Sequence, residues 1–308
     1  ALAMMMGTAS LPHVMMRYFT TPSVKAARKS VGWSLFFIFL LYSSAPMLAT
    51  LSKLSLIDPT LSTGIIGKSF AEVQSIDWFQ NWNQANLMFI SDFNGNGTLE
   101  LNEFFMGGKA VVLATPEIAG LPYVISGLVA AGGMAAAMST ADGLVLAIAN
   151  ALSHDLYYKI IDPKAETAKR LIVARVLLVI IGFAGATIAA LEIQGILGSV
   201  IWAFDFAMSG LFFPLVLGVW WKRANGPGAV AGMLLGLASG TAYLVWVRTG
   251  GAGFWGITQL TFGIVGSLVS LVSMVVVSLL TKAPDAATQR MVDEVRIPSG
   301  KTVLGKQH

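Results

Sequence analysis

The chain has 308 residues, of which 55% are hydrophobic and only 12% charged, and its mean hydropathy is +0.71. An ordinary soluble domain carries about 25% charged residues, so this composition excludes that class and indicates a membrane protein. The chain has no cysteine, which excludes a disulfide framework. The net charge of +4 does not indicate a nucleic-acid partner, because no nucleic-acid motif is present and cytoplasmic loops of membrane proteins are rich in Lys and Arg.

The chain opens on an apolar run, ALAMMMGTASLPH, with no basic segment ahead of it, which is not the pattern of a signal peptide. We interpret residues 1–16 as the end of a longer membrane helix that begins upstream. Gly7 and Pro12 predict a break in this helix, and broken helices hold ions or anionic substrates in many transporters. Polar side chains flank the predicted break: Thr8, Ser10 and His13. The alternative is a helix that ends at the membrane surface, with Arg17 at lipid head groups.

Six further apolar stretches are long enough to cross a hydrocarbon core of about 30 Å as helices. They lie near residues 31–51, 121–152, 171–191, 196–221, 228–247 and 256–280. The second is longer than the core is thick, which predicts a tilted or projecting helix. Sixteen of the 20 Lys and Arg residues fall in one set of alternate connections and the tail, and four fall in the other set. The positive-inside rule therefore predicts a multi-pass protein of the cell inner (plasma) membrane with a cytoplasmic C-terminus.

The span 121–152 carries the strongest polar signal inside the membrane. Its sequence AAGGMAAAMSTADG places Ser139, Thr140 and Asp142 behind a run of Gly and Ala. Ser139 and Asp142 share a helix face, and together with a carbonyl such as that of Ala136 these oxygens predict a site for a hard monovalent cation. The alternative is that the hydroxyls only bond to helix backbones. The carboxylate argues against it, because such a group near mid-membrane costs about 2.5–3.5 kcal/mol on insertion scales.

A second acid, Asp205 in SVIWAFDFAMSG, lies within the span 196–221. Two interpretations stay open: it is a ligand for a proton or cation, or it accepts hydrogen bonds from backbone groups near a broken helix end. Pro214 in the same span predicts a kink, because its ring removes one hydrogen bond and crowds the carbonyl four residues back.

The segment 52–119 is predicted to lie outside the cell and is acidic. Within it, DFNGNGTLELNE at residues 92–103 matches the twelve-residue EF-hand calcium loop. The predicted ligands are Asp92, Asn94, Asn96, the carbonyl of Thr98, Glu100 and the bidentate Glu103. Three carboxylates predict weak Ca²⁺ binding, with a dissociation constant of about 10⁻⁴–10⁻³ M. Against this, Gly107 and Gly108 disfavour an exiting helix, no second hand is visible, and an Asn/Gly-rich turn can match by chance.

Three segments carry a family resemblance: GTASLPHVMMRYFT, AAAMSTADGLVLAIANALSHDLYYK and FFPLVLGVWWKRANGPGAVAGM. They resemble the sodium:solute symporter family, and residues 7–9, 11–13 and 17–20 are similar to its acetate-permease-type members. The resemblance implies a leucine-transporter-type fold of inverted repeats. This chain would be the C-terminal part of that fold, from core helix six onward.

The resemblance also implies roles for single residues. The carbonyl of Ala136 and the hydroxyls of Ser139 and Thr140 match half of a sodium site, whose other ligands come from a helix upstream of this chain. Ser10 and His13 align with positions that contact substrate. Asp142 stands where some relatives carry a hydroxyl for a further sodium site, so an acid there is a departure that points to proton coupling.

We therefore predict an all-α membrane protein with about six full transmembrane helices and a partial one, in four parts. Residues 1–51 hold the end of the broken core helix six, a cytoplasmic loop and core helix seven. Residues 52–119 form the external insert, 120–282 hold helices eight to twelve, and 283–308 are a polar, unpatterned and mobile cytoplasmic tail.

The predicted function is sodium-coupled import of a small organic solute, a monocarboxylate such as acetate. Two alternatives are a symporter for an amino acid or sugar and a transporter-like membrane sensor. An enzyme is not expected, since no nucleophile–base arrangement or zinc motif is present. The expected partners are Na⁺, the solute, the lipid bilayer, the N-terminal remainder of the transporter and a small membrane subunit, with Ca²⁺ in the external loop.

Overall fold

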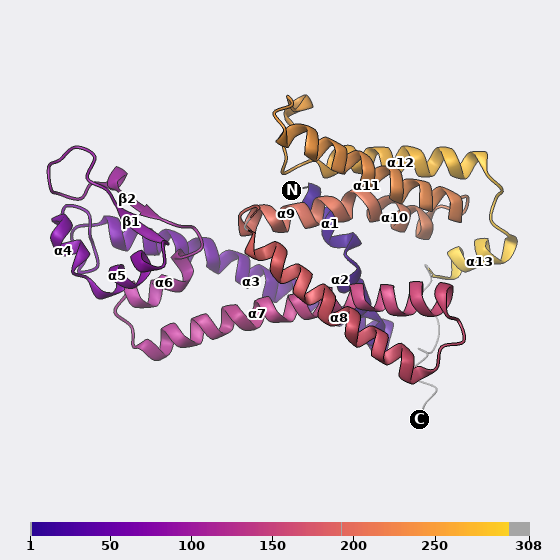
Figure 1. Cartoon of the computed structure of the whole chain (residues 1–308), viewed down its shortest axis with the longest axis horizontal. Coiled ribbons are helices and arrows are strands. Elements are labelled where there is room, and N and C mark those ends of the chain that lie inside the picture. Colours follow the sequence, from indigo (N-terminus) through magenta and orange to yellow (C-terminus); the bar gives the residue numbers. More distant parts are fainter. Residues whose placement is uncertain (1, 192, 296–308) are drawn as a thin grey trace. The chain divides into compact units, whose positions relative to one another are not determined.

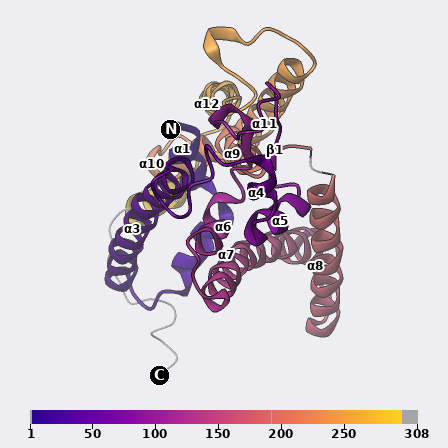
Figure 2. The same ribbon diagram turned by 90° about the vertical axis from the view of Figure 1, so that its left-hand side faces the viewer.

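The computed structural model describes residues 2–191 and 193–295, and Figures 1 and 2 show it in two views. These residues form helices almost throughout, with one two-stranded sheet, which confirms the all-α membrane class. The chain divides into two compact units. One holds the residues up to Ala27 and from Asp142 onward, and the other holds Arg28–Ala141. The inverted-repeat arrangement concerns the complete transporter and stays a prediction.

Six helices of the described residues are long and apolar enough to cross a membrane, and they correspond to the six predicted spans. They are α3 (Val24–Ile57), α7 (Tyr123–Asn150) continued by the π-helix η3 (Ala151–Ile161), α8 (Thr167–Ala190), α9 (Ile196–Ala207) continued to Trp220, α11 (Gly226–Arg248) and α12 (Gly263–Leu280). The second is 39 residues long. At 1.5 Å per residue it exceeds a core of about 30 Å, so it must tilt or project.

The N-terminal helix is broken as predicted. α1 (Leu2–Ser10) and α2 (Pro12–Met16) are separated at Leu11, whose backbone is extended at φ −71° and ψ 119°. Pro12 has no N–H with which to continue α1, and it lies in the first turn of α2, where a missing donor does no harm. A 3₁₀ turn, η1 (Arg17–Thr20), follows. One extended residue therefore divides a helix into two short ones.

Pro214 disrupts its span in a specific way. Between α9 and α10 (Phe213–Trp220), the residues Met208–Phe212 form a π-helical turn, η4. Pro214 lacks the N–H that would bond back into this turn, and the wider ladder of the π-helix takes up the mismatch. The hydroxyl of Ser209 adds a bond by donating to the carbonyl oxygen of Asp205 at 2.7 Å. The span stays continuous from Ile196 to Trp220.

α11 presents a glycine face to α12. Its buried glycines recur at every fourth position: Gly228, Gly232, Gly236 and Gly240. α12 lies along this face (Figure 1), and its buried residues there are small or flexible, among them Gly266, Ser270 and Met274. At Gly236 a Cβ would overlap the Ser209 carbonyl and lie 2.6 Å from the Ser270 Cβ. Glycine therefore lets the two backbones approach closely.

The variant Gly236→Ala is expected to destabilise this helix pair. Overpacking a close contact costs about 1–3 kcal/mol, so the melting temperature of the purified full-length protein should fall by several degrees. Gly218→Ala on α10 is the matched control, because a Cβ there meets nothing within 4 Å. Scanning fluorimetry of both variants checks the prediction, and equal melting temperatures would contradict the close contact.

The insert has a hydrophobic core of its own. Its elements are α4 (Phe70–Gln74), α5 (Asp77–Gln84), β1 (Met88–Ile90), η2 (Leu101–Glu103), β2 (Phe104–Met106) and α6 (Val111–Ile118). Figure 2 shows α4, α5 and β1 gathered together. Their core comprises Leu56, Ile65, Val73, Phe79, Met88, Leu99, Ala110, Ala114 and Ile118. β1 and β2 pair antiparallel, with Ile90 opposite Phe104, so they close the segment between them like a hairpin.

The prediction of an unpatterned tail is wrong for its first part. Helix α13 (Ala286–Val295) forms there, and the side chain of Asp285 accepts a hydrogen bond from the N–H of Thr288 at 3.0 Å, as an N-cap does. Lys222 Nζ lies 2.8 Å from Asp293 Oδ2, which ties α13 to the end of α10. The remaining tail residues, 296–308, lie outside the described residues.

Candidate ion and substrate site

The predicted sodium ligands lie on α7. The Thr140 hydroxyl donates to the Ala136 carbonyl oxygen at 3.3 Å, so two of the predicted ligand oxygens are neighbours on the helix surface. Ser139, Thr140 and Asp142 are exposed in this chain. A hydroxyl that bonds back to its own helix keeps oxygen lone pairs for another partner. The structure thus brings Ala136 and Thr140 together and leaves their oxygens accessible.

The three predicted substrate residues differ in what their polar atoms do. The Ser10 side chain is buried, and its hydroxyl donates to the carbonyls of Met6 at 2.9 Å and Gly7 at 3.0 Å. The Thr8 hydroxyl donates to its own helix as well, at 2.5 Å from the Met4 carbonyl. His13 is different, because its Nδ1 is buried with no hydrogen-bond partner among the described residues. Of the three, His13 is the residue whose polar group is left for a ligand.

His13 and Arg17 both lie against α7 at Gly143. A Cβ on Gly143 would lie 3.8 Å from the Cβ of His13 and 3.5 Å from Nη2 of Arg17. Because Gly143 has no side chain, the two basic side chains fit there. Gly143 directly follows Asp142 in the sequence. The interpretation of Arg17 as a lipid anchor did not include this contact, although the four-residue spacing from His13 places both on one helical face.

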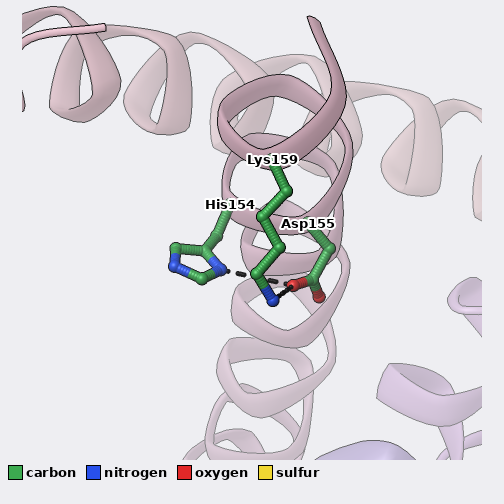
Figure 3. A network of polar contacts seen from close by, with 3 residues as sticks. All are labelled: His154, Asp155 and Lys159. Atoms are coloured by element: carbon green, nitrogen blue, oxygen red, sulfur yellow. Dashed lines mark hydrogen bonds and ion pairs between the residues drawn. The ribbon is translucent and has the colours of Figure 1, made fainter. Parts of the chain in front are cut away.

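A second polar cluster lies on the π-helix η3 and is shown in Figure 3. Lys159 Nζ is 2.8 Å and His154 Nδ1 is 3.2 Å from the same carboxylate oxygen of Asp155. All three side chains are more than half exposed, which is the setting of a surface ion pair. Just beyond the span, a hydrogen bond from Lys169 holds the pKa of Asp162 below its usual range. These contacts are typical of a solvated helix end and indicate no ligand site.

The calcium-like loop, residues 92–103, is shaped by its own predicted ligands. Asp92 accepts hydrogen bonds from the N–H groups of Gly95 at 2.7 Å and Gly97 at 3.1 Å. The amide oxygens of Asn94 and Asn96 each accept the N–H two residues on, at 2.9 and 2.7 Å. Gly95 and Gly97 have positive φ values of 73° and 69°, which only glycine adopts without strain. The loop is therefore wound with side-chain oxygens on its inner side.

The far end of the loop is anchored in the insert. The Glu103 side chain is fully buried, and its carboxylate accepts the N–H groups of Phe93 and Glu100, each at 3.0 Å. Leu99 is buried in the core, and its backbone pairs with Gly67 and Lys68 at 2.8 Å. Strands flank this loop, not the two helices of an EF-hand. Within the described residues, no three His, Asp or Glu side chains are grouped to hold a metal, and this includes the three acids of the loop.

Comparison with known proteins agrees with the membrane architecture. A profile of the sodium:solute symporter family matches residues 109–236. An uncharacterized symporter of Cupriavidus necator is 41% identical over 303 residues, which are 95% of this chain and 43% of that protein. By sequence, the chain is thus similar to members of the sodium:solute symporter family. A monocarboxylic acid transporter of Corynebacterium glutamicum is similar at 27% identity over 241 residues, 78% of this chain and 36% of that protein.

The names of the matching family and of both relatives describe symporters or transporters, and none of them describes an enzyme. The residues matched by the family profile include Ala136, Ser139, Thr140 and Asp142, whereas α1 and α2 precede them. The chain spans less than half the length of these two relatives.

Proposed function

We propose that the complete transporter imports a small monocarboxylate, such as acetate, together with sodium. The observation that carries the sodium part is the pair of adjacent, accessible oxygens on α7, the Thr140 hydroxyl and the Ala136 carbonyl. Ser139 adds a third oxygen one residue away, and Asp142 adds a carboxylate in the next turn of the same helix. Hydroxyl, carbonyl and carboxylate oxygens suit a hard cation, and the family's name supports sodium as that cation.

The substrate part of the proposal is supported by the basic groups of α2 and η1. The side chains of His13 and Arg17 both lie next to Gly143, the glycine that follows Asp142, and the buried Nδ1 of His13 has no hydrogen-bond partner among the described residues. A guanidinium binds a carboxylate with two parallel hydrogen bonds, so Arg17 suits an organic acid better than a neutral solute. The likeness to a monocarboxylic acid transporter supports the same class of solute.

The placement in the cell is also a proposal. The bias of Lys and Arg supports an inner-membrane protein with a cytoplasmic C-terminus and an external insert. The length of the relatives supports an N-terminal remainder that completes both sites. We also propose a small membrane subunit as a partner, which should co-purify with the full-length protein.

Uptake into proteoliposomes tests the proposed function. The full-length transporter, reconstituted with an inward sodium gradient, is expected to accumulate labelled acetate, and an equal potassium gradient should not drive accumulation. Competition by unlabelled acids, amino acids and sugars then identifies the solute class. Failure of every solute to accumulate would contradict transport and favour a membrane sensor.

The variant Arg17→Gln is expected to weaken recognition of the acid. Losing a charge-assisted hydrogen bond costs about 1.5–3 kcal/mol, so the KM for acetate should rise about tenfold or more. Arg28→Gln on α3 is the matched control. An uptake assay over a range of acetate concentrations checks this, and an unchanged KM in Arg17→Gln would remove Arg17 from the site.

We further propose that the loop at residues 92–103 binds Ca²⁺ through Asp92, Asn94, Asn96, Thr98, Glu100 and Glu103. The support is the winding of the loop around its own side-chain oxygens and the anchoring of Glu103 and Leu99 in the core. A loop already wound in this way loses little conformational freedom on binding. The ion would brace the insert, in the weak class that suits millimolar external calcium.

A further inference from the structure

Asp205 on α9 differs from the other buried acid of the described residues. Both Asp205 and Glu103 have fully buried side chains. The Glu103 carboxylate accepts two backbone N–H groups, whereas neither carboxyl oxygen of Asp205 has a hydrogen-bond partner. Among the described residues, Asp205 is therefore a buried carboxyl group that no hydrogen bond of regular geometry compensates.

The surroundings of Asp205 are formed by helix backbones. On one side of α9, Phe204 packs against Gly7 of α1, and on another the Asp205 side chain packs against Gly263, the first residue of α12. A Cβ on Gly263 would lie 2.6 Å from the Asp205 carboxyl oxygen Oδ1. The nearest donor is the Gly263 N–H, whose geometry falls short of a hydrogen bond. The two glycines thus allow the acid to be enclosed without a side-chain donor.

No charged side chain faces this carboxyl from the described elements α1, η4 or α12, although the amino group ahead of α1 exerts an attraction on it. α1, η4 and α12 contain no charged or titratable side chain. α11 contributes Tyr243, whose hydroxyl bonds to the backbone at Ile257 and Phe254, and Arg248, whose guanidinium lies over the Trp202 ring at 5.1 Å. An ionised carboxylate without a hydrogen bond or counter-ion is very costly at such a place, and it becomes neutral by taking up a proton.

We propose that Asp205 is a proton-binding site within the membrane-spanning part of this transporter. The carboxylate takes a proton from water to form the neutral acid when α9 is packed between Gly7 and Gly263 as it is here. Release requires an arrangement in which water or a cation reaches the carboxyl. An intramembrane acid of this kind is the usual element of a proton relay in transporters. The inference concerns proton binding alone and does not depend on sodium or on the solute.

Infrared spectroscopy of the purified full-length transporter, without sodium or solute, tests this site. At pH 7 the wild type is expected to show the carbonyl band of a protonated carboxylic acid, shifted by exchange into D₂O. Asp205→Asn should lose this band. Asp77→Asn, which replaces an exposed acid in α5, should keep it.

If the Asp205→Asn variant does not fold, Asp205→Glu takes its place in the test. The protonated-acid band of Asp205→Glu should persist, but at a frequency different from that of the wild type. A wild type with no protonated-acid band at pH 7 would overturn the proposal. So would a band that is unchanged in a folded Asp205→Asn variant. Neither outcome bears on sodium-driven uptake, so the two proposals fail separately.

Discussion

Removing both hydroxyls in Ser139→Ala/Thr140→Ala is expected to raise the sodium concentration that half-saturates uptake at least tenfold. Each hydroxyl that contacts a cation contributes about 1.5–3 kcal/mol, and about 1.4 kcal/mol corresponds to a factor of ten in affinity. The Ala136 carbonyl remains, so binding should be weakened and not abolished. Initial rates of labelled acetate uptake, measured over a range of sodium concentrations in proteoliposomes, give the half-saturating value.

Ser126→Ala supplies the matched control for this result. Ser126 lies on the same helix, more than three turns before Ser139, so its loss should leave the sodium dependence unchanged. The maximal rate at saturating sodium should be similar in all variants, because only ion binding is altered. If the double variant has the sodium dependence of the wild type, the assignment of α7 as a sodium ligand helix is wrong.

Adding 10 mM CaCl₂ is expected to raise the melting temperature of the insert in the purified transporter. With a dissociation constant of about 10⁻⁴–10⁻³ M, this concentration stabilises the bound state by about 1.4–2.7 kcal/mol. Trp78 and Trp82 pack against the core of the insert, and the Trp82 indole donates to Glu117 at 3.1 Å, so tryptophan fluorescence should follow its unfolding.

Asp92→Asn should abolish most of the calcium effect. Its amide oxygen can still accept the N–H of Gly95, but the bond from the N–H of Gly97 and the negative charge that binds the ion are lost. Asp77→Asn removes a charge elsewhere in the insert and should leave the shift intact. The same concentration of MgCl₂ controls for ionic strength. A wild-type shift that is absent, or equal with magnesium, would eliminate the calcium site.

The helices of this chain could largely be predicted from sequence, because a lipid-crossing helix needs a long apolar run and such runs are hard to mistake. Pro12 and Pro214 also identified two of the irregular points, since proline cannot donate the backbone bond that a helix needs. What could not be predicted was the conformation that follows. Nothing in the composition of Ala151–Ile161 indicates a π-helix, and the strands beside the calcium-like loop are only three residues long.

The residue types of the candidate site could be predicted from the sequence, but the contacts between residues far apart in the sequence could not. The motif around Ser139 and Thr140 indicated which oxygens are available, and the bond from the Thr140 hydroxyl to the Ala136 carbonyl is the helix-backbone bond of the alternative interpretation. The interpretation of Arg17 as a residue at lipid head groups rests on its position near a predicted helix end. Gly143, which lies next to it in space, is 126 residues away in sequence. Contacts over such separations leave no local pattern. Asp205 was recognised as unusual, yet its lack of partners depends on Gly263, on another helix.

The glycine face of α11 limits how this half of a transporter can move. The backbones in contact at Gly236 and Gly240 leave no room for a side chain between them. α11 and α12 are therefore expected to move together as one rigid pair during alternating access. The hinge of such a motion must lie outside the pair, and the π-helical turn before Pro214 offers a place where one span can bend without breaking its hydrogen bonds.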